Sequence, residues 1–508
     1  MAVNLVEDVV VINTRKMKKL ILILIFFIPV VLFSQDDEKE FKKRVLENVE
    51  VELLSSFYTQ DGDNASITGG IGSENLQDVA GNISIAIPLN DDDIFTLNGT
   101  ISAYTSASSS NLNPFYKQGS SNNDDDDDDD DDKAAARSGA SSGQGNSGQT
   151  IGTPWSASSG ASKQDVWASG TIGYSHSSDS RNTTFDTHLS FSNEFDYTSF
   201  GAGAGLSKQF NQKNTEIGLK ANIYVDFWRP QYPTEIKTFI KNNGNLNADF
   251  FNGVDILDQN GLAIDKQSAN AWNPTTSYYI NNNGRNTYSA SLSFSQILSK
   301  NIQISFFSDF VLQKGQLANP MQRVYFADKA NFYIGKASDI PNYTNRKNQG
   351  VFQLADAYEQ LPESRLKIPV GTRLHFYINE YLVFKTYYRY YRDDWSLQSH
   401  TIDVELPIKI SQKFTLYPNY RYYTQTAAKY FAPYEQHISS EKFYTSDFDL
   451  SQYNANQIGI GIKYTDVFTK KKIWKFGLKN MSLDYNYYKR NTGLYANIVS
   501  LGAKFIIE

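Results

Sequence analysis

The sequence predicts an all-β protein: a transmembrane antiparallel β-barrel of about 16 strands, with short periplasmic turns and long extracellular loops. Three observations predict it. Apolar and polar residues alternate along almost the whole chain, which is typical of strands with one apolar face. Most alternating segments hold about 12 to 16 residues, whereas strands of soluble proteins cluster near about 5 or 6. No apolar run of 18 residues follows residue 35, so further membrane contact cannot be helical.

The N-terminus has the pattern of a secretory signal peptide. Two lysines follow Met17, and an apolar run of 14 residues then ends at Phe33, before a polar and acidic stretch. Such a run is too short to span a bilayer well, and an uncleaved anchor or a buried helix is the alternative. We therefore expect residues 1–34 to be an over-called start plus a signal peptide, 35–48 a short periplasmic lead, and 49–508 the barrel.

Sixteen segments of the chain show the alternation. In the stretch 302–312, Ile304 and Phe306 share one face and the intervening polar residues share the other. At ~3.3 Å per residue and a tilt near 40°, about twelve residues climb roughly 30 Å, enough for the apolar band of an outer-membrane barrel. A secreted solenoid or a pair of sandwiches is the alternative, but its outer face would need polar residues where this chain has Ile, Leu and Phe. The segments are 49–59, 81–89, 94–105, 164–177, 183–195, 197–210, 214–228, 285–297, 301–314, 365–378, 380–393, 397–410, 412–426, 455–466, 473–488 and 493–507.

The connections between these segments are alternately tight and long. The long polar ones are 106–163, 229–284, 315–364 and 427–454. An outer-membrane barrel has this pattern, with short turns in the periplasm and longer loops outside. An even strand count then places both termini in the periplasm. Aromatic residues at the expected strand ends, such as Phe227, Trp228 and Trp395 at the outer ends and Trp474 at the inner ends, predict two interfacial girdles.

One expected loop, 111–152, is of low complexity. It holds nine consecutive carboxylates, Asp124 to Asp132, which repel one another and cannot be buried, so we expect a solvated surface loop. Capture of divalent cations is the functional alternative. The chain has a formal net charge of −7 and no basic excess, which argues against a nucleic-acid partner.

Signatures of enzymes and cofactor sites are missing from the sequence. The five His show no H-E-x-x-H spacing, and neither G-x-S-x-G nor a Walker or dinucleotide-binding pattern occurs. The lack of Cys excludes thiolate metal ligands and covalent haem attachment. Asp61 and Asp63 are weak metal candidates, because Ala65 and Gly72 stand where an EF-hand needs acidic ligands. We expect no catalytic residues and no cofactor.

Charged residues on four consecutive segments share the face opposite to the apolar one, which would be the lumen of a barrel. Cations and carboxylates on neighbouring strands can pair and hold the wall in shape, or they can set ion selectivity. A 16-strand barrel leaves an aqueous lumen unless loops fill it, and the four long loops are enough material for a plug. The predicted lumen-lining residues are Lys367, Arg373, His375, Lys385, Arg389, Asp403, Glu405, Lys409 and Arg421.

Four stretches resemble sequence blocks of an uncharacterised Gram-negative outer-membrane family, the domain of unknown function 3570. The first, Ser56 to Glu74, reads SFYTQDGDNASITGGIGSE. The others are Thr153 to Asp165, Arg392 to Thr401 and Tyr444 to Leu450. The resemblance spans nearly the whole mature chain and implies an exported β-barrel without an assigned activity. As members are often encoded near a flavin-attaching transferase and a thioredoxin-like protein, it also hints at envelope redox work.

These blocks fall at expected outer strand ends or in loops. The first contains a loop motif whose glycines supply the φ freedom of a tight loop and whose aspartates can hydrogen-bond backbone amides. A packed loop lid is one interpretation, and a ligand or partner site on that lid is the other. The motif residues are Asp61, Gly62, Asp63, Asn64, Gly69, Gly70 and Gly72.

The function predicted from these observations is a non-enzymatic, porin-like outer-membrane channel of unknown solute. Its expected partner is outer-membrane lipid. A loop-plugged scaffold for an envelope redox or electron-transfer partner is the alternative, and an outer-membrane hydrolase is the least favoured hypothesis.

Overall fold

The computed structural model describes residues 44–105, 153–157, 166–348, 350–466, 468–469 and 471–507. The expected signal peptide, 1–34, and acidic loop, 111–152, lie outside these residues, and of the expected lead only 44–48 lie within them. Residues from Arg44 onward form one compact unit. No helix in the described part of the chain is long and apolar enough to cross a membrane.

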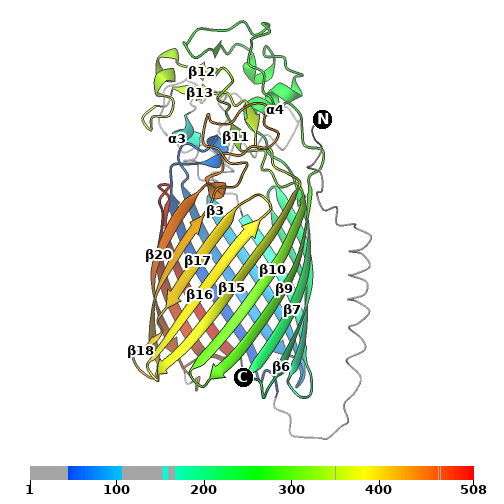
Figure 1. The fold of residues 1–508 in the computed structure, drawn as a ribbon, viewed down its shortest axis with the longest axis vertical. Coiled ribbons are helices and arrows are strands. Elements are labelled where there is room, and N and C mark those ends of the chain that lie inside the picture. The colour runs from blue at the N-terminus through cyan, green and yellow to red at the C-terminus, as the bar shows by residue number, and fades with distance from the viewer. Residues whose placement is uncertain are drawn as a thin grey trace, which may run out of the picture. The chain divides into compact units, whose positions relative to one another are not determined.

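Sixteen antiparallel strands form a closed wall, so the predicted fold class is confirmed (Figure 1). Each strand pairs with the next, and the first pairs with the last from Val49↔Ile507 to Asp61↔Tyr495, which closes the sheet. β17 and β18 are one strand broken at Pro407, because proline has no N–H for the ladder. The wall strands are β1 (Val49–Asp61), β2 (Leu76–Pro88), β3 (Asp93–Thr105), β4 (Val166–Ser177), β5 (Thr183–Glu194), β6 (Tyr197–Phe210), β7 (Thr215–Trp228), β9 (Gly284–Ser299), β10 (Ile302–Gly315), β15 (Ser364–Asn379), β16 (Leu382–Asp393), β17 (Gln398–Glu405) with β18 (Ile408–Lys409), β19 (Phe414–Gln425), β20 (Tyr453–Thr465), β22 (Phe476–Arg490) with the short β21 (Lys472–Ile473), and β23 (Tyr495–Ile507).

The outer face of the wall is apolar and exposed around the whole circumference. Period-two alternation turns every second side chain outward, and the exposed ones are mostly Ile, Leu, Val and Phe. Water-soluble monomers rarely expose a continuous apolar band of this size, and the band suits the hydrocarbon interior of a bilayer. Members of the band include Leu53, Ile101, Leu189, Phe200, Leu292, Phe310, Ile402, Ile458 and Leu501.

The predicted outer aromatic girdle is wrong in part. Trp395 is only 3% exposed and is buried among loop residues. Trp228 contacts the Tyr197 ring at a tilt, beside Arg285, on the face opposite to the exposed Phe227. Neighbouring aromatics on a strand point to opposite faces, so a pair such as Phe227-Trp228 can place only one ring in the girdle.

The long connections fold into a cap beyond one end of the barrel, which we call the loop end; the other is the turn end (Figure 1). The cap comprises residues 62–75, 153–157, 229–283, 316–348, 350–363, 394–397, 426–452 and 491–494. Its elements are α3 (Pro154–Ala157), α4 (Thr234–Lys241), the strands β8 (Ile256–Leu257), β11 (Arg323–Val324), β12 (Tyr333–Gly335), β13 (Val351–Gln353) and β14 (Ala357–Tyr358), and the 3-10 helices η2 (Ser66–Thr68), η3 (Asp249–Phe251), η4 (Ala337–Asn342) and η5 (Phe448–Leu450).

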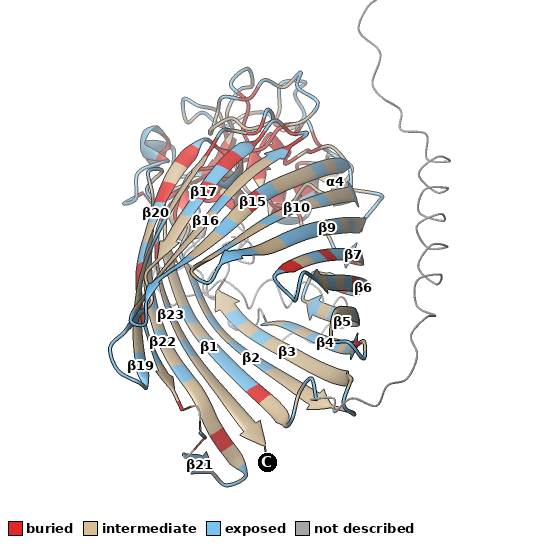
Figure 2. Cartoon of the chain, turned by 60° about the horizontal axis from the view of Figure 1, so that its bottom comes forward, coloured by how far each residue is buried: buried red, intermediate tan, exposed pale blue. Residues whose placement is uncertain are grey.

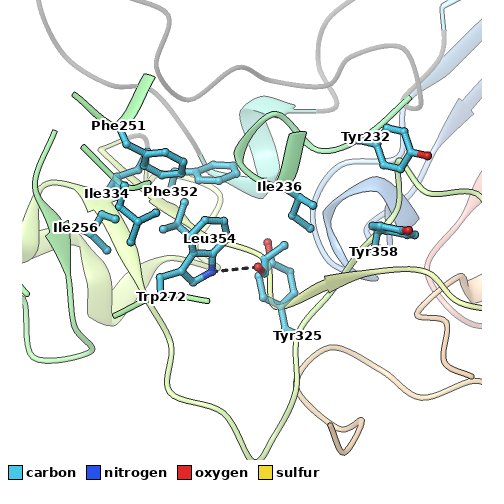
Figure 3. Close-up of a cluster of buried hydrophobic side chains, with 12 residues drawn as sticks. Tyr232, Ile236, Phe251, Ile256, Trp272, Tyr325, Ile334, Phe352, Leu354 and Tyr358 are labelled. Atoms are coloured by element: carbon cyan, nitrogen blue, oxygen red, sulfur yellow. Dashed lines mark hydrogen bonds between the residues drawn. The ribbon is translucent and has the colours of Figure 1, made fainter. Parts of the chain in front are cut away.

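The cap has a hydrophobic core of its own. Figure 3 shows Phe251, Trp272 and Phe352 packed together, and the Trp272 Nε1–H donates to the Ala355 carbonyl at 3.1 Å. Many of the buried residues of the chain lie in this region, whereas the wall is mostly half-buried or exposed (Figure 2). The cap is therefore a folded layer over the loop end.

Candidate functional site

The lumen face of the wall carries the charged residues that the sequence singled out. The register places all nine on the face opposite to exposed apolar neighbours such as Ile402. Two cross-strand ion pairs form among them: Lys385 Nζ lies 2.9 Å from Glu405 Oε1, and Arg421 Nε lies 2.9 Å from Asp403 Oδ2. His375 lies directly across the strand pair from Lys385. These pairs can hold the wall in shape.

Four lumen-face cations have no ion pair with any residue in the described part of the chain: Lys367, Arg373, Arg389 and Lys409. The Arg373 guanidinium lies over the ring of Phe307, 5.2 Å from its centroid. Arg389 Nε is buried without a hydrogen-bond partner among the described residues. β15, β16 and β18 thus present a strip of uncompensated positive charge.

The loop motif, at the end of β1 and in the β1–β2 loop, is compact and forms part of the base of the cap. Gly69, Gly70 and Gly72 have positive φ angles of 79°, 85° and 92°, which L side chains rarely adopt. A Cβ at Gly69 would lie 2.7 Å from the Tyr325 ring, and one at Gly70 would lie 2.7 Å from the Ser446 carbonyl oxygen. Glycine is required here by both conformation and space.

The acidic members of the motif have protein partners. The Tyr495 hydroxyl donates to Asp61 Oδ2 at 2.8 Å, and Arg346 pairs with Asp63. Asn64 Nδ2 donates to the Thr492 carbonyl at 2.8 Å. Among the residues that the structure describes, no group of three or more His, Cys, Asp or Glu side chains is arranged to hold a metal ion.

Three of the four sequence blocks meet at this turn and the fourth lies beside it. The β1–β2 loop packs at Gly72 against Pro154 of the second block and at Gly70 against Ser446 of the last. Trp395, from the third block, packs with Leu450 in a neighbouring apolar cluster. The blocks therefore form the base of the cap, where it meets the lumen.

A buried ion pair that sequence reasoning missed joins this base to the rest of the cap. Arg323 Nε lies 2.8 Å from Glu235 Oε1, and the side chains are 1% and 0% exposed. Arg323 Nη1 also donates to the Ile67 carbonyl at 3.1 Å. One guanidinium thereby ties β11 to α4 and to η2. The partners are 88 residues apart, in a short helix and a two-residue strand of different loops, so no spacing pattern could have revealed them.

A polar cavity of about 260 Å³ lies where the cap meets the lumen. It receives cationic side chains from the wall and acidic side chains from the cap. Burial raises the pKa of the Glu359 carboxyl to about 8, and burial beside Asp449 raises the pKa of Asp447 to about 6. The lining residues are Arg285, Gln313, Leu317, Asn319, Gln322, Glu359, Leu361, Arg365, Lys367, Trp395, Asp447, Asp449 and Leu450.

Replacing Gly72 with Ala is expected to loosen the cap base by about 1–3 kcal/mol, through a strained φ and a collision with the Pro154 carbonyl oxygen. Hydrogen–deuterium exchange of residues 62–75 would report the loosening. Gly253→Ala is the matched control, because Gly253 also has a positive φ of 71° but open space around its Cα. Equal exchange in the two variants would show that packing against Pro154 contributes nothing.

Several solved outer-membrane proteins share the general barrel shape. The chain aligns over 91% of its length with a bacterial polysaccharide outer-membrane secretin (8% identity, TM-score 0.40, 99% of that chain covered). It aligns over the same share with Pseudomonas aeruginosa OccK1 (OpdK; 8% identity, TM-score 0.33, 99% covered). A BenF-like porin from Pseudomonas fluorescens aligns similarly (91% of this chain and 98% of that one, 9% identity, TM-score 0.35). Sequence identities and TM-scores this low indicate a shared barrel shape and nothing more.

No curated protein matches the chain. A family model described as "Protein of unknown function (DUF3570)" matches residues 29–502. This span includes all four sequence blocks and every wall strand except the end of β23. The resemblance noted in the sequence is therefore confirmed, and the chain belongs to the DUF3570 family.

Proposed function

We propose that this protein is a non-enzymatic, porin-like channel of the outer membrane that passes small hydrophilic solutes. The observation that carries the proposal is the combination of an apolar, exposed outer face with a charged inner face on the same strands. Water-filled barrels of this size have that arrangement. The turn end, where β1 begins and β23 ends, is assigned to the periplasm, and the cap to the cell exterior.

The cationic strip on β15, β16 and β18 biases the channel towards anions. A charge held on a low-dielectric wall acts strongly on ions in a narrow aqueous path. Lys385 and Arg421 are neutralised by their carboxylate partners. Arg373, Arg389 and Lys409 have no such partner among the described residues, so their charge acts on the solute.

The double variant Arg373→Gln, Arg389→Gln is expected to reduce the preference for anions. Purified protein in a planar bilayer under a KCl gradient would show conductance steps, and the reversal potential of the variant would move towards that of a non-selective pore. Lys300→Gln, in the exposed turn between β9 and β10, removes a positive charge outside the lumen and should leave the reversal potential unchanged.

The folded cap favours one alternative, a sealed scaffold for an envelope redox partner. A cap with its own core and a buried ion pair can close the lumen permanently. The bilayer recording separates the two functions: a protein without conductance steps that co-purifies in mild detergent with a flavin- or haem-bearing protein would be the scaffold.

A further inference from the structure

The cavity between cap and lumen is lined by three cations from the wall, and only two of them are neutralised. Arg285 Nε lies 2.7 Å from Asp226 Oδ2, and Arg365 Nε lies 2.9 Å from Asp393 Oδ2. The Lys367 side chain has neither an ion pair nor a hydrogen bond with any residue that the structure describes, although it is half-buried. A desolvated ammonium without a partner is costly, so this group is placed to receive an anion.

No carboxylate on the cap side of the cavity forms an ion pair with Lys367 among the described residues. Glu359 accepts the Asn319 N–H at 2.6 Å, and burial raises its pKa to about 8, so it is mostly neutral at pH 7. Asp447 accepts the Asp449 N–H at 2.9 Å and keeps its charge, because its pKa is raised only to about 6. Gln322 Oε1 is buried with no donor among the described residues. One free cation on the wall side thus faces an acidic, acceptor-rich surface.

Between the two polar sides the lining is apolar. Leu317, Leu361 and Leu450 contribute side chains, and the indole of Trp395 stacks under the Arg365 guanidinium, whose carbon lies 4.2 Å from the ring centroid. A volume of about 260 Å³ equals the share of roughly nine water molecules in the liquid, which suits a solute of amino-acid size.

We propose that this cavity binds a free α-amino acid with an aliphatic side chain, with its carboxylate on Lys367, its ammonium on Asp447 and Gln322, and its side chain against the leucines and Trp395. The proposal rests on the proposed function, because it names the solute class that the channel would receive from outside. A charge-assisted hydrogen bond at each end fixes the orientation of the solute.

Calorimetric titration of the full-length protein in detergent at pH 7 tests this with three probes: L-leucine, isocaproate, which lacks the ammonium, and isoamylamine, which lacks the carboxylate. We expect leucine to bind and each analogue to bind about tenfold more weakly or worse. Lys367→Met should weaken leucine binding by about tenfold or more and leave isoamylamine unaffected. Lys300→Met, the same chemical change on an exposed turn, should match the wild type.

Loss of leucine binding in Lys367→Met can be distinguished from loss of folding. Lys367→Met removes an unpaired, half-buried charge, so the variant should resist heat as well as the wild type does on a semi-native gel. Absence of leucine binding to the wild type, or unchanged binding to Lys367→Met, would overturn the site. Isocaproate binding as tightly as leucine would overturn the amino-acid class. Conductance without leucine binding rejects this inference alone, whereas leucine binding without conductance rejects the channel alone.

Discussion

Truncating the chain after Tyr495 is expected to prevent assembly of the barrel. The missing residues form almost all of β23, which pairs with β22 on one side and with β1 on the other. Without them, β1 and β22 would each present an unpaired edge to lipid, where a backbone N–H or C=O without a partner costs several kcal/mol. The ladder from Val49↔Ile507 to Gln60↔Ala496 would be lost.

The measurement is the heat-modifiable mobility of the protein in isolated outer membranes, together with its resistance to urea extraction. Val499→Ala is the matched control: it shortens one lipid-facing side chain of β23 but keeps every backbone hydrogen bond, so it should assemble normally. A truncated chain that is still heat-modifiable and urea-resistant in the membrane would be incompatible with a closed barrel.

The barrel could be predicted from the sequence because the pattern that specifies each strand lies within a short, continuous stretch of the chain. Each wall strand repeats an outward apolar and an inward polar residue, as in Ile402 and Asp403, and all sixteen expected segments overlap a wall strand. Four of the nine predicted lumen residues proved to be paired across neighbouring strands, which follows from the same register. The period of two determines which residues of a strand share a face, and the order of the strands determines which side chains can pair across the sheet.

The cap could not be predicted in the same way, because its contacts join residues that are far apart in the sequence and lie in short elements of long loops. Trp272 donates to Ala355 across 83 residues, and Ile236, Phe251 and Phe352 come from an α-helix, a 3-10 helix and a short strand. None of these positions belongs to a periodic apolar pattern that is long enough to predict a helix or a strand. The same reason explains Trp395, which looked like a girdle residue by its place at a strand end and instead fills the cap base.

The cavity lies at the boundary of these two regions. Its wall side, with Lys367 and Arg365, follows from strand periodicity, and only Lys367 of that side was singled out in the sequence. Its cap side, with Glu359 and Gln322, depends on loop folding. A site assembled from both carries no sequence signal of its own, although two of the four family blocks, around Trp395 and Asp447, contribute to it.

Replacing Arg323 with Met is expected to destabilise the cap by about 3–5 kcal/mol while the barrel stays assembled. The change leaves the Glu235 carboxylate buried without a cation, and breaking a buried pair on one side costs about that much. It also removes the donor to the Ile67 carbonyl, which anchors the β1–β2 loop. Hydrogen–deuterium exchange should therefore rise in both 62–75 and 234–241, with unchanged exchange in β1 and β23.

The double variant Glu235→Leu, Arg323→Met distinguishes charge imbalance from lost contact. Two apolar side chains of similar size fill the same space and leave no unpaired buried carboxylate. Most of the protection from hydrogen–deuterium exchange in 234–241 should therefore return. Protection in 62–75 should return only in part, because the hydrogen bond to Ile67 stays broken at a cost of about 1 kcal/mol. If the single variant exchanges like the wild type, the pair does not hold the cap; if the double variant is as labile as the single one, packing and not charge is what Arg323 supplies. Either way, the barrel serves as an internal reference, since the pair lies wholly outside its wall.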